Sequence, residues 1–350
     1  MMKIEEKIIH IMLHRERKHT APLVNLLNKE REYLANIFFF IGSPKKIPEI
    51  INQKNVRYLY DIEHYKNLLK ALSQAKKVIL HGAWIEFVIK FINRNPTLHE
   101  KLIWIPWGGD YYYPHLQPTW KKDFFKNVKY LMTPSLPCVH YIRTNYNAEP
   151  VIFQHLTYPV AIHEKDNYRP DQVKTDNNNT DMLNVLVGNS ATQTNNHIAA
   201  FSKLKDSGLD NIQVYCPLSY GSKSYASDIK RVGRYYFGQS FHPLEVFLSK
   251  QQYENFLKKI HVGVFAHKRQ QAMGNCYMLL GFGKTIYLPS DSANKKHLSN
   301  FGFRVKNVDR FYDGLLSRGD IEHNLTIRNR YFSKEVFISG WDQVFEENLG

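Results

Sequence analysis

The sequence predicts an α/β protein built from two doubly wound, Rossmann-like domains that face each other across a cleft. Short apolar runs bounded by Gly, Pro or Asn alternate with longer amphipathic stretches, which is typical of βα units around a mostly parallel sheet. At 350 residues the chain is longer than one ordinary core requires. Residues 166–181 (DNYRPDQVKTDNNNTD) are polar and nearly featureless, which indicates a linker. We therefore expect domains at 1–165 and 182–350, with the C-terminal helices packing back on the first domain as an alternative.

The elements of each predicted domain follow from periodicity and from their end signals. In the first domain, strands are expected at 8–13, 37–41, 56–60, 78–80, 102–107 and 150–153. Helices are expected at 22–33, after a Thr20 cap, and at 62–74, after an Asp61 cap. In the second domain, strands are expected at 183–187, 212–215, 262–265 and 285–288, and helices at 197–205, 253–259 and 270–281. No internal repeat of fixed period is visible.

Composition and charge narrow the possible functions. Hydrophobic residues make up 43% of the chain and aromatic residues 14%, which indicates a folded globular protein. The formal net charge is +15, which favours a polyanionic partner: nucleic acid, an anionic lipid surface or phosphorylated substrates. A basic surface that only confers solubility is the alternative.

The cysteines and apolar runs indicate a cytoplasmic protein. Cys138, Cys216 and Cys276 are widely spaced and form no CxxC pattern, so neither a disulfide framework nor a zinc site is expected, and a reducing compartment fits best. The apolar run at 8–13 is too short for the core of a signal peptide. No stretch reaches the ~18 apolar residues of a spanning helix, so membrane contact would be peripheral.

The first turn of the second predicted domain is a candidate phosphate site. An apolar strand runs into Gly188, Asn189 and Ser190, and Asn195 and His197 follow at the start of a helix. Glycine permits a tight turn, and the amides and partial positive charge of a helix start suit a phosphate. The pattern is not the GxGxxG fingerprint. An ordinary βα turn with a Thr194 or Asn195 cap is the alternative.

A second candidate segment joins a predicted strand to the helix at 270–281. It contains Arg269, Gln270, Gln271, Gly274 and Asn275, at the carboxyl end of a strand, where open α/β sheets bind ligands. Arg269 can neutralise a departing diphosphate, and the Gln amides can bind sugar hydroxyls. Alternatively, Arg269 is a solvated surface residue and Gly274 serves helix packing.

The chain contains no Asp-x-Asp triplet. Hard divalent cations want grouped oxygen ligands, so we expect no metal cofactor and a leaving group stabilised by helix starts and basic side chains.

In the first predicted domain, two strand ends carry polar side chains beside aromatic ones. The first ends in His81 and Gly82, and the second runs into Trp107, Gly108, Gly109, Asp110 and Tyr111. Aromatic faces stack on sugar rings, and Asp110 can accept a proton from, or orient, an acceptor hydroxyl. The alternatives are a structural His81 and an Asp110 that caps a turn.

The segment 120–130 combines an apolar stripe with lysines. Trp120, Phe124 and Val128 recur every four residues while lysines occupy other positions, so a helix here can lie on an anionic membrane. A core-facing helix with a solvated basic face is the alternative.

Taken in order, these segments resemble one family: the TDP-N-acetylfucosamine:lipid II N-acetylfucosaminyltransferases, also described as 4-alpha-L-fucosyltransferases of glycosyltransferase family 56. The matching text is His81-Gly82, Trp104, Trp107-Gly108-Gly109-Asp110-Tyr111, Val185-Leu186-Val187-Gly188-Asn189-Ser190, Asn195, His197-Ile198-Ala199-Ala200 and Arg269-Gln270-Gln271 with Gly274. The ordered set spreads over most of the chain.

The resemblance implies a GT-B transferase at the cytoplasmic face of the inner membrane. It implies a TDP-sugar donor held by the second domain and a polyprenyl-diphosphate-linked saccharide acceptor facing the first, in enterobacterial common antigen-like synthesis. Two departures stand out: Ala-Thr-Gln-Thr-Asn-Asn follows Ser190 where Gly-Asp-Arg-Ser-Asn-Glu is expected, and Ala272 replaces a third glycine after the paired glutamines. Both fall around the donor pocket that the resemblance implies.

Two rival functions remain open at this point. One is a GT-B transferase with another nucleotide sugar or glycan acceptor. The other is a basic nucleic-acid-binding protein, which rests only on charge and aromatic content, because no RRM, KH or zinc-finger signature is present. Of the two classes we favour the transferase, without a nucleic-acid partner.

Overall fold

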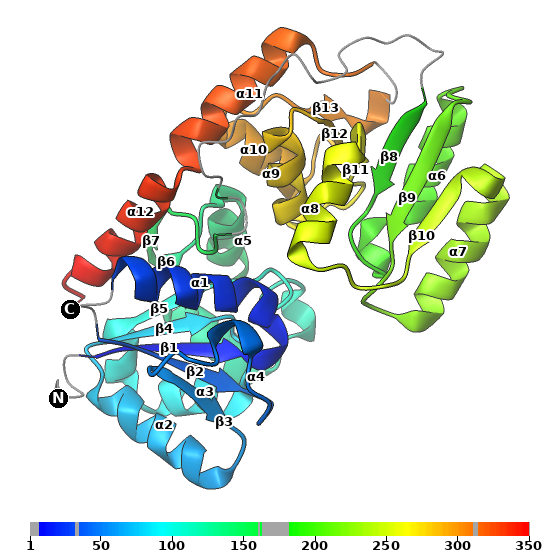
Figure 1. Ribbon diagram of the computed structural model, residues 1–350. Helices are drawn as coiled ribbons and strands as arrows, with labels where there is room; N and C mark the ends of the chain where they lie inside the picture. The colour runs from blue at the N-terminus through cyan, green and yellow to red at the C-terminus, as the bar shows by residue number, and fades with distance from the viewer. Residues whose placement is uncertain (1–6, 32–34, 160–161, 163–181, 311–313, 350) are drawn as a thin grey trace. The chain divides into compact units, whose positions relative to one another are not determined.

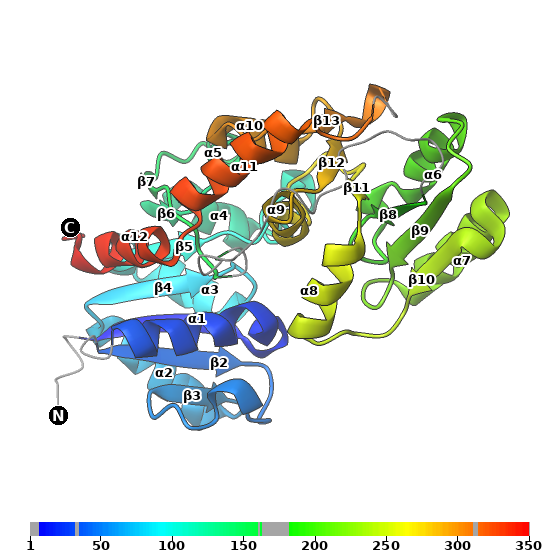
Figure 2. The ribbon, with the colours of Figure 1, turned by 45° about the horizontal axis from the view of Figure 1, so that its top comes forward.

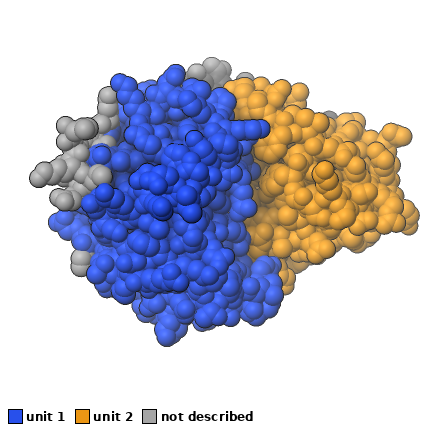
Figure 3. All heavy atoms as spheres, turned by 90° about the horizontal axis from the view of Figure 1, so that it is seen from below, with its two compact units in different colours: residues 1–162, 334–350 blue, residues 163–333 orange. Residues whose placement is uncertain are grey.

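The computed structural model describes residues 7–31, 35–159, 162, 182–310 and 314–349. The chain divides into two compact units: residues 1–162 together with 334–350, and residues 163–333 (Figure 3). The expected linker at 166–181 lies outside the described residues. The last helix, α12 (Lys334–Glu346), groups with the first unit rather than with residues 182–333. The cause is local packing and hydrogen bonding: Trp341 is fully buried, and Lys77 donates to the carbonyl oxygens of Val344 and Phe345 at 2.8 and 2.6 Å.

Within its described residues, the first unit holds a parallel sheet of seven strands in the order β3-β2-β1-β4-β5-β6-β7 (Figure 1). The strands are β1 Ile8–Leu13, β2 Asn36–Ile41, β3 Val56–Leu59, β4 Lys77–His81, β5 Leu102–Ile105, β6 Tyr130–Met132 and β7 Val151–Phe153. The order reverses direction between β1 and β4, which are hydrogen-bonded neighbours. Such a reversal is the position where open α/β sheets bind ligands, outside the carboxyl ends of the strands.

The helices of the first unit are α1 Arg17–Glu30, α2 Ile62–Gln74, α3 Glu86–Arg94, α4 Thr119–Asn127, α5 Leu136–Tyr146 and α12. The expected Asp61 cap of α2 is confirmed, because its carboxylate accepts from the backbone N–H of His64. The expected Thr20 cap is wrong: α1 begins at Arg17, Pro22 lies inside it, and the Thr20 hydroxyl donates to the Glu16 carbonyl within the helix. Proline is common at the start of a helix, but Pro22 lies beyond the first turn of α1.

The two faces of this sheet carry different side chains. On one face, Ile9 and Ile11 share a hydrophobic core with residues of α2, α3, α4 and α5. The other face carries His10, whose ring lies 4.5 Å from Phe38 and 5.9 Å from Trp341 of α12, centroid to centroid. Helices α1 and α2 lie on opposite sides of the sheet (Figures 1 and 2). A fully buried histidine therefore lies within the sheet next to its reversal point.

Within its described residues, the second unit holds a parallel sheet of six strands in the order β10-β9-β8-β11-β12-β13. The strands are β8 Leu183–Val187, β9 Ile212–Pro217, β10 Phe241–Leu244, β11 Val262–Val264, β12 Thr285–Leu288 and β13 Lys306–Asn307. The helices are α6 His197–Asp206, α7 Lys223–Phe237, α8 Lys250–Lys259, α9 Met273–Gly281, α10 Ala293–Phe301 and α11 Arg318–Tyr331. Here the order reverses between β8 and β11, so this unit repeats the topological feature of the first.

Two helices of the second unit start at residues with left-handed backbone. Asn196 precedes α6 with φ +51°, and Ala272 precedes α9 with φ +57°. The alternative that Thr194 or Asn195 caps α6 is therefore wrong, because Asn196 is the cap residue and its side chain makes no capping bond. Helix α9 begins three residues later than expected, because the turn at Ala272 separates the paired glutamines from the helix.

Among the described residues, no helix combines the length and apolar character that crossing a bilayer requires.

Candidate functional site

Each unit presents polar side chains at the carboxyl ends of its central strands. We call these the first-unit edge, formed by the loops after β1, β4 and β5, and the second-unit edge, formed by the loops after β8 and β11. Each edge is described by itself.

Gly188 is the first residue of the second-unit edge, and a side chain at this position would strain the backbone and meet neighbouring atoms. Its φ is +69°, and a Cβ at this position would lie 2.6 Å from Nε2 of His197 and 3.1 Å from Oδ1 of Asn195. Its N–H donates to the Val264 carbonyl of β11 at 3.0 Å, which holds the turn against the neighbouring strand. The sequence-predicted turn at the start of this unit is therefore tightly packed against His197 and Asn195.

Asn195 braces the loop from inside. Its side chain is fully buried; Oδ1 accepts from the Asn189 N–H at 3.1 Å, and Nδ2 donates to the Ser190 carbonyl at 2.9 Å. Both amide atoms are thus used to fix the two residues that follow Gly188. Because the loop is already ordered, its remaining polar groups can bind a ligand without a further loss of conformational entropy.

Gln271 joins the β8 loop to the β11 loop. Its Nε2 donates to Asn189 Oδ1 at 2.8 Å, and its Oε1 accepts from the Thr194 hydroxyl at 2.7 Å. A guanidinium nitrogen of Arg269 donates to the same Thr194 hydroxyl at 3.3 Å. The two segments singled out from the sequence, separated by about 80 residues, therefore meet at one site.

The remaining predicted donor-side residues lie at or just before the start of α9. Gln270 lies in the segment before the helix, and Gly274 and Asn275 lie in its first turn; all three are partly exposed. Asn294 of α10 holds this segment through its side-chain amide. Its Nδ2 donates to the Gln271 carbonyl at 2.6 Å and to Nε2 of His267 at 3.0 Å. Sequence reasoning missed Asn294 and His267, which carry no local motif.

The histidines of this edge are neutral at pH 7. Burial lowers the pKa of His197 to about 4 and that of His267 to about 3. Nδ1 of His197 lies 3.1 Å from the Tyr225 hydroxyl, whereas Nε2, beside Gly188, has no hydrogen-bond partner within the described part of the chain. The positive charge of the edge therefore comes from Arg269, from the starts of α6 and α9, and from Lys268, which is paired with Asp291. Together these groups suit an anion.

Asp110 is the centre of the first-unit edge. It is fully buried; Oδ2 accepts from the Ala83 N–H at 2.9 Å and from Nε1 of Trp104 at 3.2 Å, and Oδ1 accepts from the Trp107 N–H at 2.9 Å. Burial raises the pKa of its carboxyl, and the backbone N–H donors oppose that rise. The carboxylate thereby ties the loop after β4 to the loop after β5.

Trp84 fills the space between the two glycines of this edge. A Cβ on Gly82 would lie 2.4 Å from Nε1 of Trp84, and one on Gly109 would lie 3.0 Å from its six-membered ring. The guanidinium of Arg15 and the ammonium of Lys121 lie 5.1 and 5.3 Å from the centroid of the Trp84 ring. Trp84 was not singled out from the sequence, although it follows His81-Gly82 by two residues.

The other predicted acceptor-side residues separate into exposed-edge and core positions. Trp107 lies at the edge, with ring centroids 4.9 Å from Tyr158 and 5.3 Å from His19. Gly108 adopts φ +86° in the turn that follows. The Tyr111 ring is 1% exposed and packs in the core, so it does not offer a face at the edge for a sugar to stack on.

His81 is buried at the end of β4 and bonded on both ring nitrogens. Nε2 lies 3.2 Å from Nδ1 of His10, and Nδ1 lies 2.7 Å from the Tyr158 hydroxyl. Tyr158 follows β7 and was not predicted as a site residue. The only feature of the sequence that could have indicated it is its position just after the last strand of the first unit.

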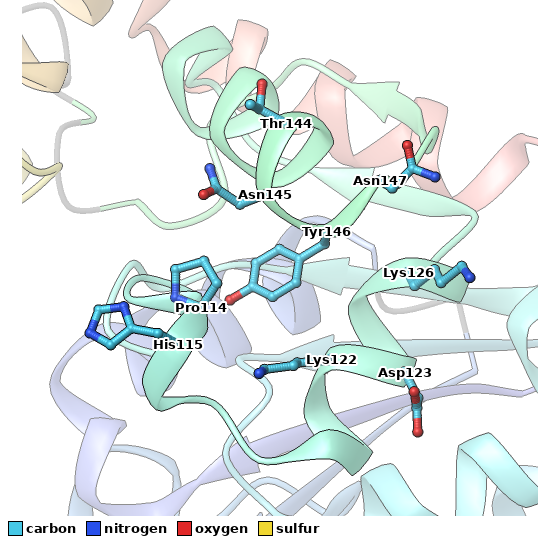
Figure 4. A pocket seen from close by; sticks show the side chains of 9 residues that line it. All are labelled: Pro114, His115, Lys122, Asp123, Lys126, Thr144, Asn145, Tyr146 and Asn147. Atoms are coloured by element: carbon cyan, nitrogen blue, oxygen red, sulfur yellow. The ribbon is translucent and has the colours of Figure 1, made fainter.

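Helix α4 turns its apolar stripe inward. Phe124 and Val128 are buried in the first-unit core, so they offer no surface to a membrane. Lys122 and Lys126 lie on the solvated side and line an open pocket of about 420 Å³ (Figure 4). The structure therefore matches the core-facing alternative for this helix, with a basic outer face. The pocket is lined by Pro114, His115, Lys122, Asp123, Lys126, Thr144, Asn145, Tyr146 and Asn147.

Within the described ranges, no three His, Cys, Asp or Glu side chains are grouped so as to hold a metal ion. Metal independence stays a prediction.

Comparison with known proteins gives a family match and a set of similar folds. The family model described as 4-alpha-L-fucosyltransferase, glycosyl transferase group 56, matches residues 9–311. A glycosyltransferase from Rickettsia africae superposes with a TM-score of 0.69 at 9% identity, covering 98% of each chain. The lipopolysaccharide outer core galactosyltransferase WaaB superposes with a TM-score of 0.64 at 9% identity, covering 97% of this chain and 98% of the other. A putative UDP-N-acetylglucosamine 2-epimerase from Listeria monocytogenes reaches 0.56 at 14% identity, covering 98% of each chain. These likenesses show the two-domain GT-B fold.

Proposed function

Because the chain belongs to the 4-alpha-L-fucosyltransferase family, glycosyl transferase group 56, and is a glycosyltransferase, we propose that it transfers a Fuc4NAc-like deoxyamino sugar from a TDP-sugar. The proposed acceptor is a polyprenyl-diphosphate-linked saccharide, and the product serves a cell-surface polysaccharide of the enterobacterial common antigen type. The ordered match of His81-Gly82, Trp107–Tyr111, Gly188–Ser190 and Arg269–Gln271 to that family supports the finer assignment.

The observation that carries the proposal is the junction of two loops at the second-unit edge. Gln271 and Thr194 join the loop after β8 to the loop after β11, and Arg269 bonds to the same Thr194 hydroxyl. A cationic side chain thus lies beside two helix starts, which supports binding of the donor's diphosphate and stabilisation of the charge that develops as the nucleotide diphosphate leaves.

The first-unit edge supports the acceptor side. Both oxygens of Asp110 already accept N–H donors, which favours an orienting role over that of a base. Asp110 would hold the loops that carry Gly82 and Trp107 in the shape that the acceptor saccharide requires.

The proposed location is the cytoplasmic face of the inner membrane. A net charge of +15 supports contact with an anionic membrane surface, and the exposed Lys122 and Lys126 of α4 add local charge to such a contact.

A thermal-shift comparison of TDP, UDP, GDP and CMP tests the donor class, because a ligand that binds only the folded state raises its stability. We expect TDP to stabilise the protein most. Transfer from TDP-Fuc4NAc to a lipid-linked saccharide then tests the reaction. Stabilisation by another nucleotide alone would reject the TDP donor and favour a transferase with a different nucleotide sugar.

A further inference from the structure

Four side chains of the first unit form a continuous hydrogen-bonded line across the sheet. The line runs from Asn36 on β2, through His10 on β1 and His81 on β4, to Tyr158 after β7. Its distances are 3.1 Å from Asn36 Oδ1 to His10 Nε2, 3.2 Å from His10 Nδ1 to His81 Nε2, and 2.7 Å from His81 Nδ1 to the Tyr158 hydroxyl. We call it the His10–His81 line.

The protonation of the line follows from burial. Burial lowers the pKa of His10 to about 3 and holds the pKa of His81 well below its usual value, so each ring is neutral and carries one proton at pH 7. Burial also raises the pKa of Tyr158, so its hydroxyl keeps its proton. The line therefore contains three protons for three hydrogen bonds.

The direction of all three bonds is then fixed. The Asn36 oxygen can only accept, so His10 carries its proton on Nε2 and leaves Nδ1 bare. His81 must donate from Nε2 to that bare nitrogen, which leaves its own Nδ1 as an acceptor. The Tyr158 hydroxyl therefore donates to His81. Its oxygen also interacts with the Trp107 side chain, and a second lone pair can accept from another group.

One end of the line reaches the first-unit edge. Asn36, His10 and His81 are buried, whereas Tyr158 is partly exposed. Tyr158 lies against Trp107, at the carboxyl ends of β4 and β5 beside the reversal of strand order. A ligand at the first-unit edge would meet a tyrosine oxygen that is set to accept a hydrogen bond.

We propose that Tyr158 accepts the hydrogen bond of the attacking acceptor hydroxyl and that the His10–His81 line receives its proton. The proposal rests on the function proposed above. As the acceptor oxygen bonds to the sugar's anomeric carbon, the bond from that carbon to the diphosphate oxygen breaks, and its electron pair leaves with the diphosphate. The acceptor proton passes to the Tyr158 oxygen while the Tyr158 proton passes to Nδ1 of His81. His81 becomes an imidazolium whose Nε2–H stays bonded to His10, and it returns the proton to solvent through Tyr158 when product leaves.

A histidine held in place can take the proton late in the step. The acceptor hydroxyl becomes strongly acidic only when its oxygen is already bonding to the sugar, so the proton moves to a positioned base at that point. The other titratable groups that act on Tyr158 are Glu16, His19 and Asp110, and His10 is the one that acts on His81. Tyr158 is the catalytic residue of the proposal, and His10 and Asn36 are positioning residues that fix the tautomer of His81.

The test compares Tyr158→Phe with Tyr141→Phe. Tyr141 is also partly exposed in the first unit, and its hydroxyl accepts from the Tyr113 N–H at 3.1 Å, so each variant removes one hydroxyl and at least one hydrogen bond. We expect Tyr158→Phe to lower kcat by about 100-fold or more while the donor KM changes by less than about twofold. Tyr141→Phe should keep wild-type kcat. Equal kcat for the two variants would overturn the proposal.

A double variant separates a relay from ordinary packing. His81→Gln alone should cost about as much kcat as Tyr158→Phe, and the double variant should lose little more, because the two groups act as one unit. Multiplying losses would contradict the proposal. Both comparisons are made with the nucleotide sugar and acceptor that the wild-type protein uses. If these are not a TDP-sugar and a lipid-linked saccharide, the proposed function is rejected, but the kcat values of the variants still test the role of Tyr158.

Discussion

Among the described residues, the two sheets share one strand order over six strands, but their loops carry different side chains at the carboxyl ends of the central strands. At the second-unit edge, side-chain amides of Asn195 and Gln271 fix two loops around a partly exposed arginine. At the first-unit edge, a buried carboxylate fixes two loops around aromatic and neutral histidine side chains. The strand order is shared, so the difference lies in the loop residues. Under the function proposed above, these residues make one edge suitable for an anion and the other for a hydroxyl.

The manner of fixing also differs, and it ranks the expected effects of mutation. Asp110 holds its loops through a single fully buried charge, whereas the second-unit edge spreads the same task over several neutral side chains. Loss of one buried ionic hub should therefore cost more than loss of one member of a neutral network.

Among the substitutions, Asp110→Asn should have the largest effect. An amide places an NH₂ group against at least one N–H donor that the carboxylate now satisfies, so we expect a loss of about 3 kcal/mol in the free energy of unfolding and loss of turnover. TDP affinity should persist. Turnover, TDP titration and urea unfolding measure the three effects. Asp123→Asn, on the exposed side of α4, is the control and should change none of them. Unchanged turnover in Asp110→Asn would remove this residue from the acceptor side.

Arg269→Ala should affect donor use alone. Loss of a charge-assisted contact to the diphosphate is worth about 1.5–3 kcal/mol, so the donor KM should rise by about tenfold to a hundredfold while the acceptor KM holds. Steady-state kinetics with each substrate varied in turn measures both. Arg234→Ala removes the same charge from an exposed position on α7 and should leave both constants unchanged. A normal donor KM in Arg269→Ala would refute its role.

Acid should destabilise both units, because each contains buried neutral histidines. The folded pKa is about 3 for His10, His267 and His297 and about 4 for His197, against 6.5 for an ordinary histidine. From pH 6.5 down to about 4, the unfolded chain binds protons that the folded chain does not, so stability falls as pH falls.

The expected loss between pH 7.5 and 5.5 is about 1.4 kcal/mol for each of these histidines. Urea midpoints at the two pH values measure the sum. His140→Gln, at an exposed position of α5, is the control variant. Equal midpoints at both pH values would mean that these rings are protonated in the folded protein.

The sequence predicted the elements whose signals are local. Strand β1 and helix α2 were predicted with their observed bounds. The apolar run that marks β1 is continuous, and the Asp61 cap comes directly before the first residue of α2. Strand β13 was missed because it is two residues long, and strand β6 was missed because it starts at Tyr130, within the segment that we interpreted as a helix. Strand β10 was missed because Pro243 argues against a strand. The proline is tolerated because β10 lies at the edge of the sheet.

The residues of the candidate site fall into the same two groups, those with a local sequence signal and those without one. Gly188–Ser190 and Arg269–Gln271 were recognisable because each follows an apolar strand, but the bond from Thr194 to Gln271 joins residues 77 positions apart and leaves no local pattern. His10 reads from the sequence as one more strand residue, and Asn36 and Tyr158 carry no motif. Only the order of strands β2, β1 and β4 brings Asn36, His10 and His81 together, and the segment after β7 adds Tyr158.

Ala272→Gly should give the smallest effect, and it should be a gain. Ala272 holds φ +57° before α9, at the position where the family pattern has glycine. A left-handed backbone costs a residue with a Cβ about 1–2 kcal/mol, and the greater freedom of glycine in the unfolded chain offsets part of that. We expect the free energy of unfolding to rise by about 0.5–1 kcal/mol in urea. Ala293→Gly, at the helical first position of α10, should instead lower it. If both substitutions destabilise the protein, the turn before α9 is not strained, and the departure from glycine has no energetic cost at this edge.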